Sequence, residues 1–237
     1  MTATEPGEVG AAPVGALYDS RRCAHYAKPA LRGWLHLLWF AASLVAGPLL
    51  VAHAHGAARI TSLAVYAVSV TALFGISALY HRGTWAPAWS RRLQRMDHLM
   101  IFFLIAGTAT PVYLMAVHGV SRWIGLAVIW TLTLTAAAVH LAWMAAPELL
   151  VGSTFIGLGL AGGLALPAVW IHAGLGPGLL MLAGGLLYIG GAVSYHHRWL
   201  DPSPAVFGYH ESFHVCVCAA ATCQVLAITL LAARVTG

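Results

Sequence analysis

The chain has 237 residues, of which 60% are hydrophobic and only 8% are charged. A soluble domain carries about 25% charged residues, so this composition excludes an ordinary soluble protein. The formal net charge of +5 does not indicate nucleic-acid binding, because the basic residues flank apolar segments instead of forming one patch. Four cysteines are too few for a disulfide framework.

Residues 1–33 have no apolar periodicity, and we predict that they form a flexible cytoplasmic tail. The rest of the chain, residues 34–237, is predicted to form one all-α transmembrane domain, because apolar runs of about 20 residues cross a bilayer. The first run exceeds the length of a signal peptide and is interpreted as an uncleaved helix. Seven transmembrane helices are expected, at residues 34–52, 60–80, 97–117, 123–145, 151–172, 178–196 and 207–233.

Basic residues are distributed unequally between the two sides of this predicted bundle. Nine lie before the first helix, between the second and third, or between the sixth and seventh, and three lie on the opposite side. The positive-inside rule therefore predicts a cytoplasmic N-terminus and an external C-terminus. The nine are Arg21, Arg22, Lys28, Arg32, Arg82, Arg91, Arg92, Arg95 and Arg198, and the three are Arg59, Arg122 and Arg234.

Polar residues occur where three of the predicted helices reach the cytoplasmic side. His81 closes the second helix, Asp97 opens the third, and the motif His210-Glu211-Ser212-Phe213-His214 opens the last. Residues four apart share one face of a helix, so His210 and His214 can reach the same metal ion. Ionisable groups inside a membrane are costly and usually functional. We predict that His81, His210 and His214 bind zinc and leave one coordination position open.

Two further side chains are candidate catalytic residues beside these histidines. Asp97 can orient or deprotonate a zinc-bound water, whose pKa zinc lowers to about 7. Ser77 lies one turn from His81 on the same helix face, so its hydroxyl can donate a hydrogen bond to a developing oxyanion.

Alternatives stay open for each of these residues. Asp97 can instead pair with Arg95 or His98 at the interface. Ser77 can bond a carbonyl of its own helix, as serines in membranes often do. The two histidines of the last helix can be structural without a metal.

Other residues are weaker candidates for the same site. His196 and His197 end the sixth helix on the same side and are the best competitors as ligands. Cys218 lies four residues after His214 and is a possible fourth ligand. His36 and His140 are interpreted as partners in interhelical hydrogen bonds.

The letters H-E-x-x-H also suggest a metalloprotease with Glu211 as general base. No histidine or carboxylate follows His214, so a third ligand would have to come from upstream, and we interpret Glu211 as facing a loop or the interface. The small residues Gly159 and Gly163, and likewise Gly184, Gly185, Gly190 and Gly191, are interpreted as sites of close helix packing.

Five short motifs follow one another along nearly all of the chain after the tail. They are Lys28-Pro29-Ala30-Leu31-Arg32-Gly33-Trp34-Leu35-His36, Ser77-x-x-x-His81, Arg95-Met96-Asp97-His98, Ile105-Ala106-Gly107-Thr108-Ala109-Thr110-Pro111 and Phe207-Gly208-Tyr209-His210-Glu211-Ser212-Phe213-His214. Together they resemble the hemolysin III branch of the progestin and adipoQ receptor superfamily. The resemblance implies a multi-pass protein of a bacterial plasma membrane, with zinc held by His81, His210 and His214. It also implies that Asp97 contacts the metal through water and that Ser77 lies nearby.

The superfamily is related to alkaline ceramidases, which hydrolyse a lipid amide, and bacterial members are linked to membrane-lipid homeostasis or called hemolysins. Our leading hypothesis is a zinc-dependent hydrolase that takes a membrane lipid as its substrate. A non-enzymatic sensor of membrane homeostasis, with structural zinc and a lipid ligand, is the alternative. A pore-forming cytolysin is the second alternative, although the hydrophobicity suits a resident membrane protein better. The sequence does not specify an oligomeric state.

Overall fold

The computed structural model describes residues 17–19, 24–26, 28–143 and 146–234. Within that part of the chain, seven helical segments are long and apolar enough to cross a membrane, which confirms the predicted all-α bundle of seven spans. The helices are α1 (Trp34–Ala52), α2 (Ala57–Arg82), α3 (Pro87–Ala116), α4 (Gly119–Ala142), α5 (Glu148–Gly163), α6 (Leu166–Ala173), α7 (Leu175–His197) and α8 (Tyr209–Arg234). The fifth span comprises α5 and α6 together.

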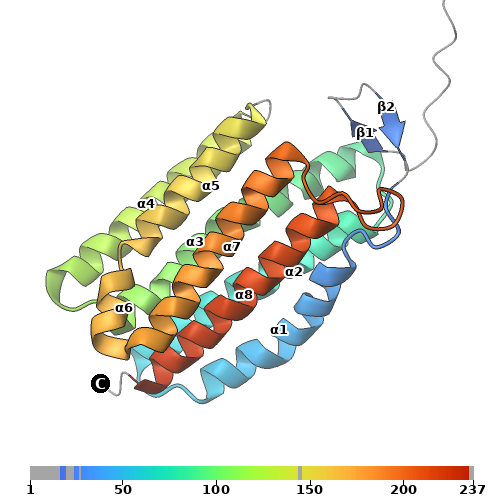
Figure 1. Ribbon diagram of the computed structural model, residues 1–237. Coiled ribbons are helices and arrows are strands. Elements are labelled where there is room, and N and C mark those ends of the chain that lie inside the picture. The colour runs from blue at the N-terminus through green and yellow to red at the C-terminus, as the bar shows by residue number, and fades with distance from the viewer. Residues whose placement is uncertain (1–16, 20–23, 27, 144–145, 235–237) are drawn as a thin grey trace, which may run out of the picture.

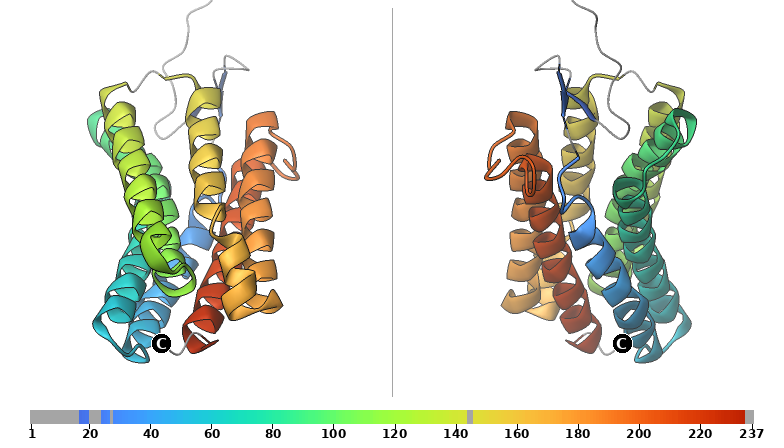
Figure 2. Two further views of the ribbon diagram at one scale, coloured as in Figure 1. Left: turned by 90° about the vertical axis from the view of Figure 1, so that its left-hand side faces the viewer. Right: turned by 90° about the vertical axis from the view of Figure 1, so that its right-hand side faces the viewer.

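Successive spans run in opposite directions, so the bundle has two ends (Figure 1). The start of α1 and the α2–α3 and α7–α8 connections lie at one end, called here the N-terminal end, and α8 finishes at the other (Figures 1 and 2). The central helix is α3, which contacts α2, α4, α5, α6 and α8. Because α8 also contacts α1 and α7, the first and last spans are neighbours.

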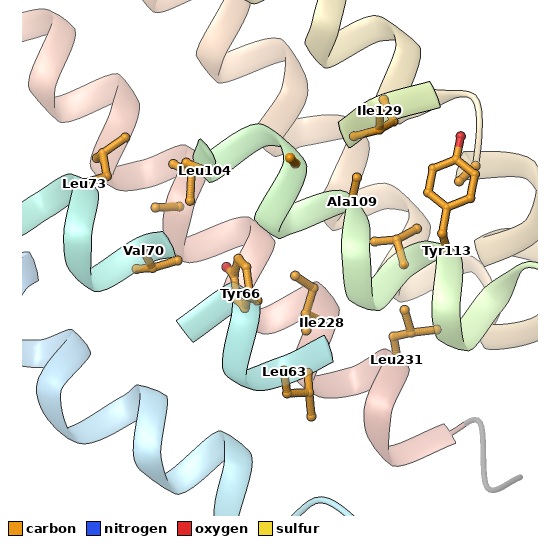
Figure 3. Packing of buried hydrophobic residues seen from close by; sticks show 14 of the residues in the cluster. Leu63, Tyr66, Val70, Leu73, Leu104, Ala109, Tyr113, Ile129, Ile228 and Leu231 are labelled. Carbon is orange, nitrogen blue, oxygen red and sulfur yellow. The ribbon is translucent and has the colours of Figure 1, made fainter. Parts of the chain in front are cut away.

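Apolar side chains of α2, α3 and α8 form much of the core (Figure 3). Leu63 and Tyr66 of α2 face Ile228 and Leu231 of α8, and all four are buried. Between helices in a bilayer such contacts stabilise mainly by van der Waals packing, because the lipid tails are as apolar as the side chains. The core therefore fixes how α2 and α8 lie relative to each other.

The third helix begins earlier than predicted. It starts at Pro87, ten residues before Asp97. Proline at the first helical position loses no hydrogen bond, because that N–H has no partner inside the helix. Asp97 consequently lies within α3 instead of at its start, and the helix continues through Pro111.

The fifth span is predicted as one helix, but in the structure it consists of two. The helix α5 ends at Gly163, and α6 begins at Leu166 with a proline in its first turn. Consecutive glycines weaken a helix, and Pro167 cannot donate the hydrogen bond that would continue it. The break lies in the half of the bundle that is distant from the N-terminal end.

The part of the predicted tail that the structure describes contains a short antiparallel sheet of two strands. The strands are β1 (Leu17–Asp19) and β2 (Ala24–Tyr26), with Tyr18 opposite His25. Residues 1–16, 20–23 and 27 lie outside the described residues, so the flexibility of the tail stays a prediction.

The glycines predicted to allow close helix packing divide into two groups. A Cβ atom added at Gly191 of α7 would lie 2.8 Å from the Cβ atom of Cys216 in α8, and one at Gly184 would lie 3.1 Å from the carbonyl oxygen of Ala220. The interpretation is therefore confirmed for Gly184 and Gly191 at the α7–α8 contact. It is wrong for Gly185 and Gly190 of α7 and for Gly159 and Gly163 of α5, where an added Cβ would have no described atom within 4 Å.

Candidate metal centre

The N-terminal end of the bundle brings together the three histidines predicted as ligands. His81 lies in the last turn of α2, and His210 and His214 lie in the first two turns of α8. One ring nitrogen from each of the three lies within 4.8 Å of the other two. His81 and His214 are buried and His210 is partly buried. Such a group can hold a metal ion.

The rings are arranged with their nitrogens converging. Nε2 of His210 lies 3.3 Å from Nε2 of His81. The ring of His214 meets the rings of His81 and His210 edge to face, with centroids 5.0 Å and 4.7 Å apart. Two imidazole nitrogens bound tetrahedrally at about 2.0–2.1 Å from zinc lie about 3.3–3.4 Å apart. The spacing of the His81 and His210 nitrogens therefore fits a shared tetrahedral metal.

The carboxylate of Asp97 lies beside the same histidine nitrogen. Its Oδ2 is 3.5 Å from Nε2 of His81, and Ser77 is a further polar neighbour of the carboxylate. The sequence left a pairing with Arg95 or His98 open for Asp97, and in the structure the carboxylate lies against His81, with His98 as a further electrostatic neighbour. An acidic oxygen next to the converging nitrogens is placed either to contact a bound ion or to accept a proton.

His36 is a site residue that the sequence-based interpretation missed. As expected, it makes an interhelical hydrogen bond, with Nδ1 2.8 Å from Oγ of Ser77. Its ring also stacks on that of His214, with centroids 3.7 Å apart and planes 14° apart. The sequence could have indicated this, because His36 lies in the first turn of a helix that begins at the same end as the three predicted ligands. It links α1 to both α2 and α8.

Glu211, the acidic residue of the H-E-x-x-H motif, is committed to structural contacts. It is 1% exposed, forms an ion pair with Arg32 and accepts a hydrogen bond from the backbone N–H of Gly208 at 2.8 Å. The latter is half of a capping box, which satisfies an otherwise unpaired donor at the start of α8. These contacts disfavour a metalloprotease role, because both carboxylate oxygens already have partners.

Other contacts fix the position where α8 begins. The N–H of Tyr209 donates to Oδ1 of Asp201 at 3.0 Å, and the hydroxyl of Ser212 donates to the carbonyl of Leu200 at 2.6 Å. Both bonds connect the first turn of α8 to the loop that precedes it. The histidines of this turn are thereby held at a defined height in the bundle.

The segment before α1 packs against both loops that flank the site. The N–H groups of Ala30 and Leu31 donate to the carbonyls of Ala205 and Val206, both at 3.1 Å. Nζ of Lys28 donates to the carbonyl of Gly83 at 2.9 Å. Partial burial, together with the charges of two nearby arginines, holds the pKa of Lys28 below its usual value. The segment joins the loop after His81 to the loop before His210.

Gly33 explains how this segment approaches the site so closely. Its φ of +80° is left-handed, and an added Cβ atom would lie 2.8 Å from the Cβ atom of His81. Glycine is the residue that tolerates both conditions. Any side chain at this position would push α1 away from the last turn of α2.

The competing ligands predicted from sequence lie outside this group. Among the residues that the structure describes, the metal-capable set contains neither His196, His197 nor Cys218. The ring of His197 stacks instead on Trp199, with centroids 4.7 Å apart. Cys218 is partly buried, one turn further along α8 than His214.

A bundle of seven spans with converging buried imidazoles at one end defines a class of polytopic membrane proteins with a candidate metal centre. The chain belongs to the haemolysin-III related family, whose model matches residues 24–225. It is similar to Hemolysin-3 of Bacillus cereus, with 38% identity over 89 residues. That match covers 36% of this chain, and the chain spans 40% of the length of this relative. The predicted membership of the hemolysin III family is therefore confirmed.

Proposed function

We propose that the chain is a zinc-dependent membrane hydrolase that cleaves an amide or ester bond of a membrane lipid and acts in membrane-lipid homeostasis. The observation that carries this proposal is the convergence of His81, His210 and His214, with a carboxylate oxygen of Asp97 3.5 Å from the ligand nitrogen of His81. Three nitrogen ligands with an adjacent acid are typical of catalytic zinc sites, which keep one position for water or substrate.

His81, His210 and His214 would hold the ion. Three neutral imidazoles suit zinc better than the hard cations calcium and magnesium, which prefer oxygen ligands. When bound, zinc would supply a Lewis acid that polarises a carbonyl and activates water.

The neighbouring side chains would then divide the remaining tasks. Asp97 would accept the proton of the attacking water as general base. Ser77 would donate a hydrogen bond to the oxygen that gains charge. His36, hydrogen-bonded to Ser77 at 2.8 Å, would orient that hydroxyl, and its stacking on His214 would hold the ligand ring.

We further propose that the site lies toward the cytoplasmic side of a bacterial plasma membrane. The nine-to-three distribution of basic residues predicts this orientation, with the N-terminus inside and the C-terminus outside. A reporter enzyme that is active only outside the cytoplasm should therefore be active when it is fused after Gly237. A cytoplasmic signal from this fusion would contradict the orientation.

Metal removal tests the hydrolase proposal directly. The purified chain should contain about one zinc ion, measured by elemental mass spectrometry. Stripping the ion with a chelator should abolish release of fatty acid from a mixture of sphingolipid and phospholipid vesicles, and adding zinc back should restore it. Zinc-loaded protein that releases no product from any lipid class would contradict the proposal.

The alternative is a non-enzymatic membrane-homeostasis sensor in which zinc holds α2 and α8 together. The observation that favours this alternative is the position of Asp97 beside His81, because its carboxylate would close the open position if it were a fourth ligand. The name of the Bacillus cereus relative keeps a cytolysin as a second alternative. Lysis of erythrocytes by the purified chain, without lipid hydrolysis, would favour the cytolysin.

A further inference from the structure

A groove of about 420 Å³ lies between α4 and α5 and reaches the side of α3. This volume is within the range of about 300–1,000 Å³ that is typical of small-molecule sites. Its walls are almost entirely hydrocarbon, from residues such as Phe102, Leu132, Val139 and Leu158. No charged side chain lines it among the described residues.

One buried polar side chain, His140, lines this groove, and the two threonines that also line it, Thr135 and Thr154, are not buried. His140 is 7% exposed, and neither of its ring nitrogens has a hydrogen-bond partner in the described part of the chain. Its ring neighbours are those of His98 and Phe102, with centroids 5.4 Å and 6.1 Å away. The predicted interhelical hydrogen bond of His140 is therefore not found. Leaving a buried polar group unpaired destabilises the fold, so a hydrogen-bond partner inside the groove would offset that cost.

His140 lies near one end of the membrane-spanning helix α4, as an ester carbonyl lies at one end of an acyl chain. It lies two residues before the end of α4, near the level where α5 begins. From His140 to Leu132 the groove follows α4 for about 12 Å, at about 1.5 Å per residue. Half of a bilayer's hydrocarbon core is about 15 Å thick. The apolar part therefore has nearly the depth of one leaflet.

The groove also opens toward the lipid-facing surface of the bundle. Leu132, Val139, Trp143 and Leu150, which line it, are all substantially exposed. Trp143 lies at the end of α4, at the level where tryptophan is enriched in membrane proteins. A molecule that is already in the bilayer can enter sideways without crossing water.

We propose that this groove binds one acyl chain of a bilayer phospholipid, with a ring N–H of His140 donating a hydrogen bond to the ester carbonyl. The uncharged, apolar wall fits the chain, and the single buried donor fits the carbonyl at its end. The site is separate from the metal centre, because Phe102 faces the groove while Asp97, further toward the start of α3, faces His81. The proposal does not depend on the proposed hydrolase activity.

Photo-labelling of the full-length chain tests this proposal. The protein is reconstituted in vesicles of phosphatidylethanolamine and phosphatidylglycerol that contain a phospholipid with a diazirine in one acyl chain. We expect the label on peptides of α4 and α5. His140→Phe keeps a flat ring but removes the donor, and should lower this labelling about two- to tenfold, the range expected for one hydrogen bond.

Two glycines of α5 provide a matched pair of variants that does not involve His140. Gly157 lines the groove, whereas Gly159 does not. An added Cβ atom at either position would have no described atom within 4 Å, so both should tolerate phenylalanine. Gly157→Phe should fill the groove and suppress the labelling at least as strongly as His140→Phe, and Gly159→Phe should leave it unchanged.

The outcomes separate a specific site from general contact with lipid. Equal labelling of Gly157→Phe and Gly159→Phe would overturn the proposal and leave only annular lipid on this face. Displacement of the label by free fatty acid, and not by unlabelled phospholipid, would overturn the choice of occupant. If His140→Phe does not fold, as judged by thermal unfolding, the glycine pair still decides.

Discussion

The candidate metal centre and the α4–α5 groove lie toward the same end of the bundle, but they place histidines in opposite surroundings. At the metal centre four imidazoles contact one another, and hydrogen bonds, stacking and a carboxylate surround them. In the groove a single imidazole, His140, is buried among hydrocarbon with both nitrogens unpaired. The two regions differ as strongly in packing, because α3 is mostly buried inside the bundle and α5 is mostly not.

This difference separates polar groups that find their partners within the protein from a polar group that does not. Polar groups inside a membrane need partners. The helices α1, α2, α3 and α8 provide those partners to one another at the metal centre. In the groove between α4 and α5, the described helices provide no hydrogen-bond partner for His140. We therefore expect substitutions at the two sites to have different effects.

The largest effect is expected from removing a metal ligand. His81→Ala should lower zinc affinity by more than about 100-fold, because even loss of an outer partner of a ligand costs about 10–100-fold. Zinc content of the purified protein measures this, with His196→Ala as a control histidine at the same end. Normal zinc content in His81→Ala would remove α2 from the site.

Removing only the charge of Asp97 tests its catalytic role. Asp97→Asn keeps the size of the side chain and a hydrogen bond, so most of the zinc should be retained. Lipid turnover should fall about 10²–10⁴-fold, the usual contribution of a general base. Asp201→Asn, which can still accept from the N–H of Tyr209, should keep full turnover. A folded, zinc-loaded Asp97→Asn protein with normal turnover would favour the sensor.

Breaking the buried ion pair tests how much it stabilises the fold around the candidate metal centre. Glu211→Gln should lower the free energy of unfolding by about 3–5 kcal/mol, because Arg32 would be left buried without a counter-charge. The double variant Arg32→Met/Glu211→Gln should recover much of this loss. Thermal unfolding in detergent measures both, with the exposed Arg91→Met as a control. Equal stability of the single and double variants would show that an uncompensated Arg32 is not the cause of the loss.

The smallest effect is expected from adding one methyl group at each of two glycines. Gly191→Ala should destabilise the protein by about 1–3 kcal/mol, because its Cβ atom would press against Cys216. Gly159→Ala should be neutral or stabilise by up to about 1 kcal/mol, because alanine favours a helix and nothing described lies nearby. Thermal unfolding again measures the difference. Destabilisation by Gly159→Ala would indicate a contact outside this chain.

The seven spans and the convergence of the three histidines could be predicted, because a bilayer restricts a polytopic chain to apolar helices that alternate in direction. Hydropathy identified the seven spans, and their alternation brought His81, His210 and His214 to one end. The proximity of His36 to His214 could not be predicted in the same way, because it depends on which helices are neighbours, and alternation gives only depth. The contact between α1 and α8 comes from the three-dimensional packing.

Other features depended on local chemistry that hydropathy ignores. The early start of α3 follows from Pro87, in a stretch too basic to resemble a span. The break after Gly163 follows from two glycines and Pro167 inside an otherwise apolar run. The pairing of Arg32 with Glu211 joins residues that sequence analysis assigned to a tail and to a loop-facing position, and neither pattern indicated the other.

The Arg32–Glu211 pair has a consequence for how the chain is made. Its two members are 179 residues apart, and Arg32 precedes the first helix whereas Glu211 is in the last. During synthesis, the guanidinium emerges from the ribosome long before its counter-ion exists. The segment that carries it can settle against the α7–α8 loop only after the other helices have been inserted. Assembly of the candidate metal centre is therefore a late step of biogenesis, and a chain that stalls before α8 carries a cation without its counter-ion.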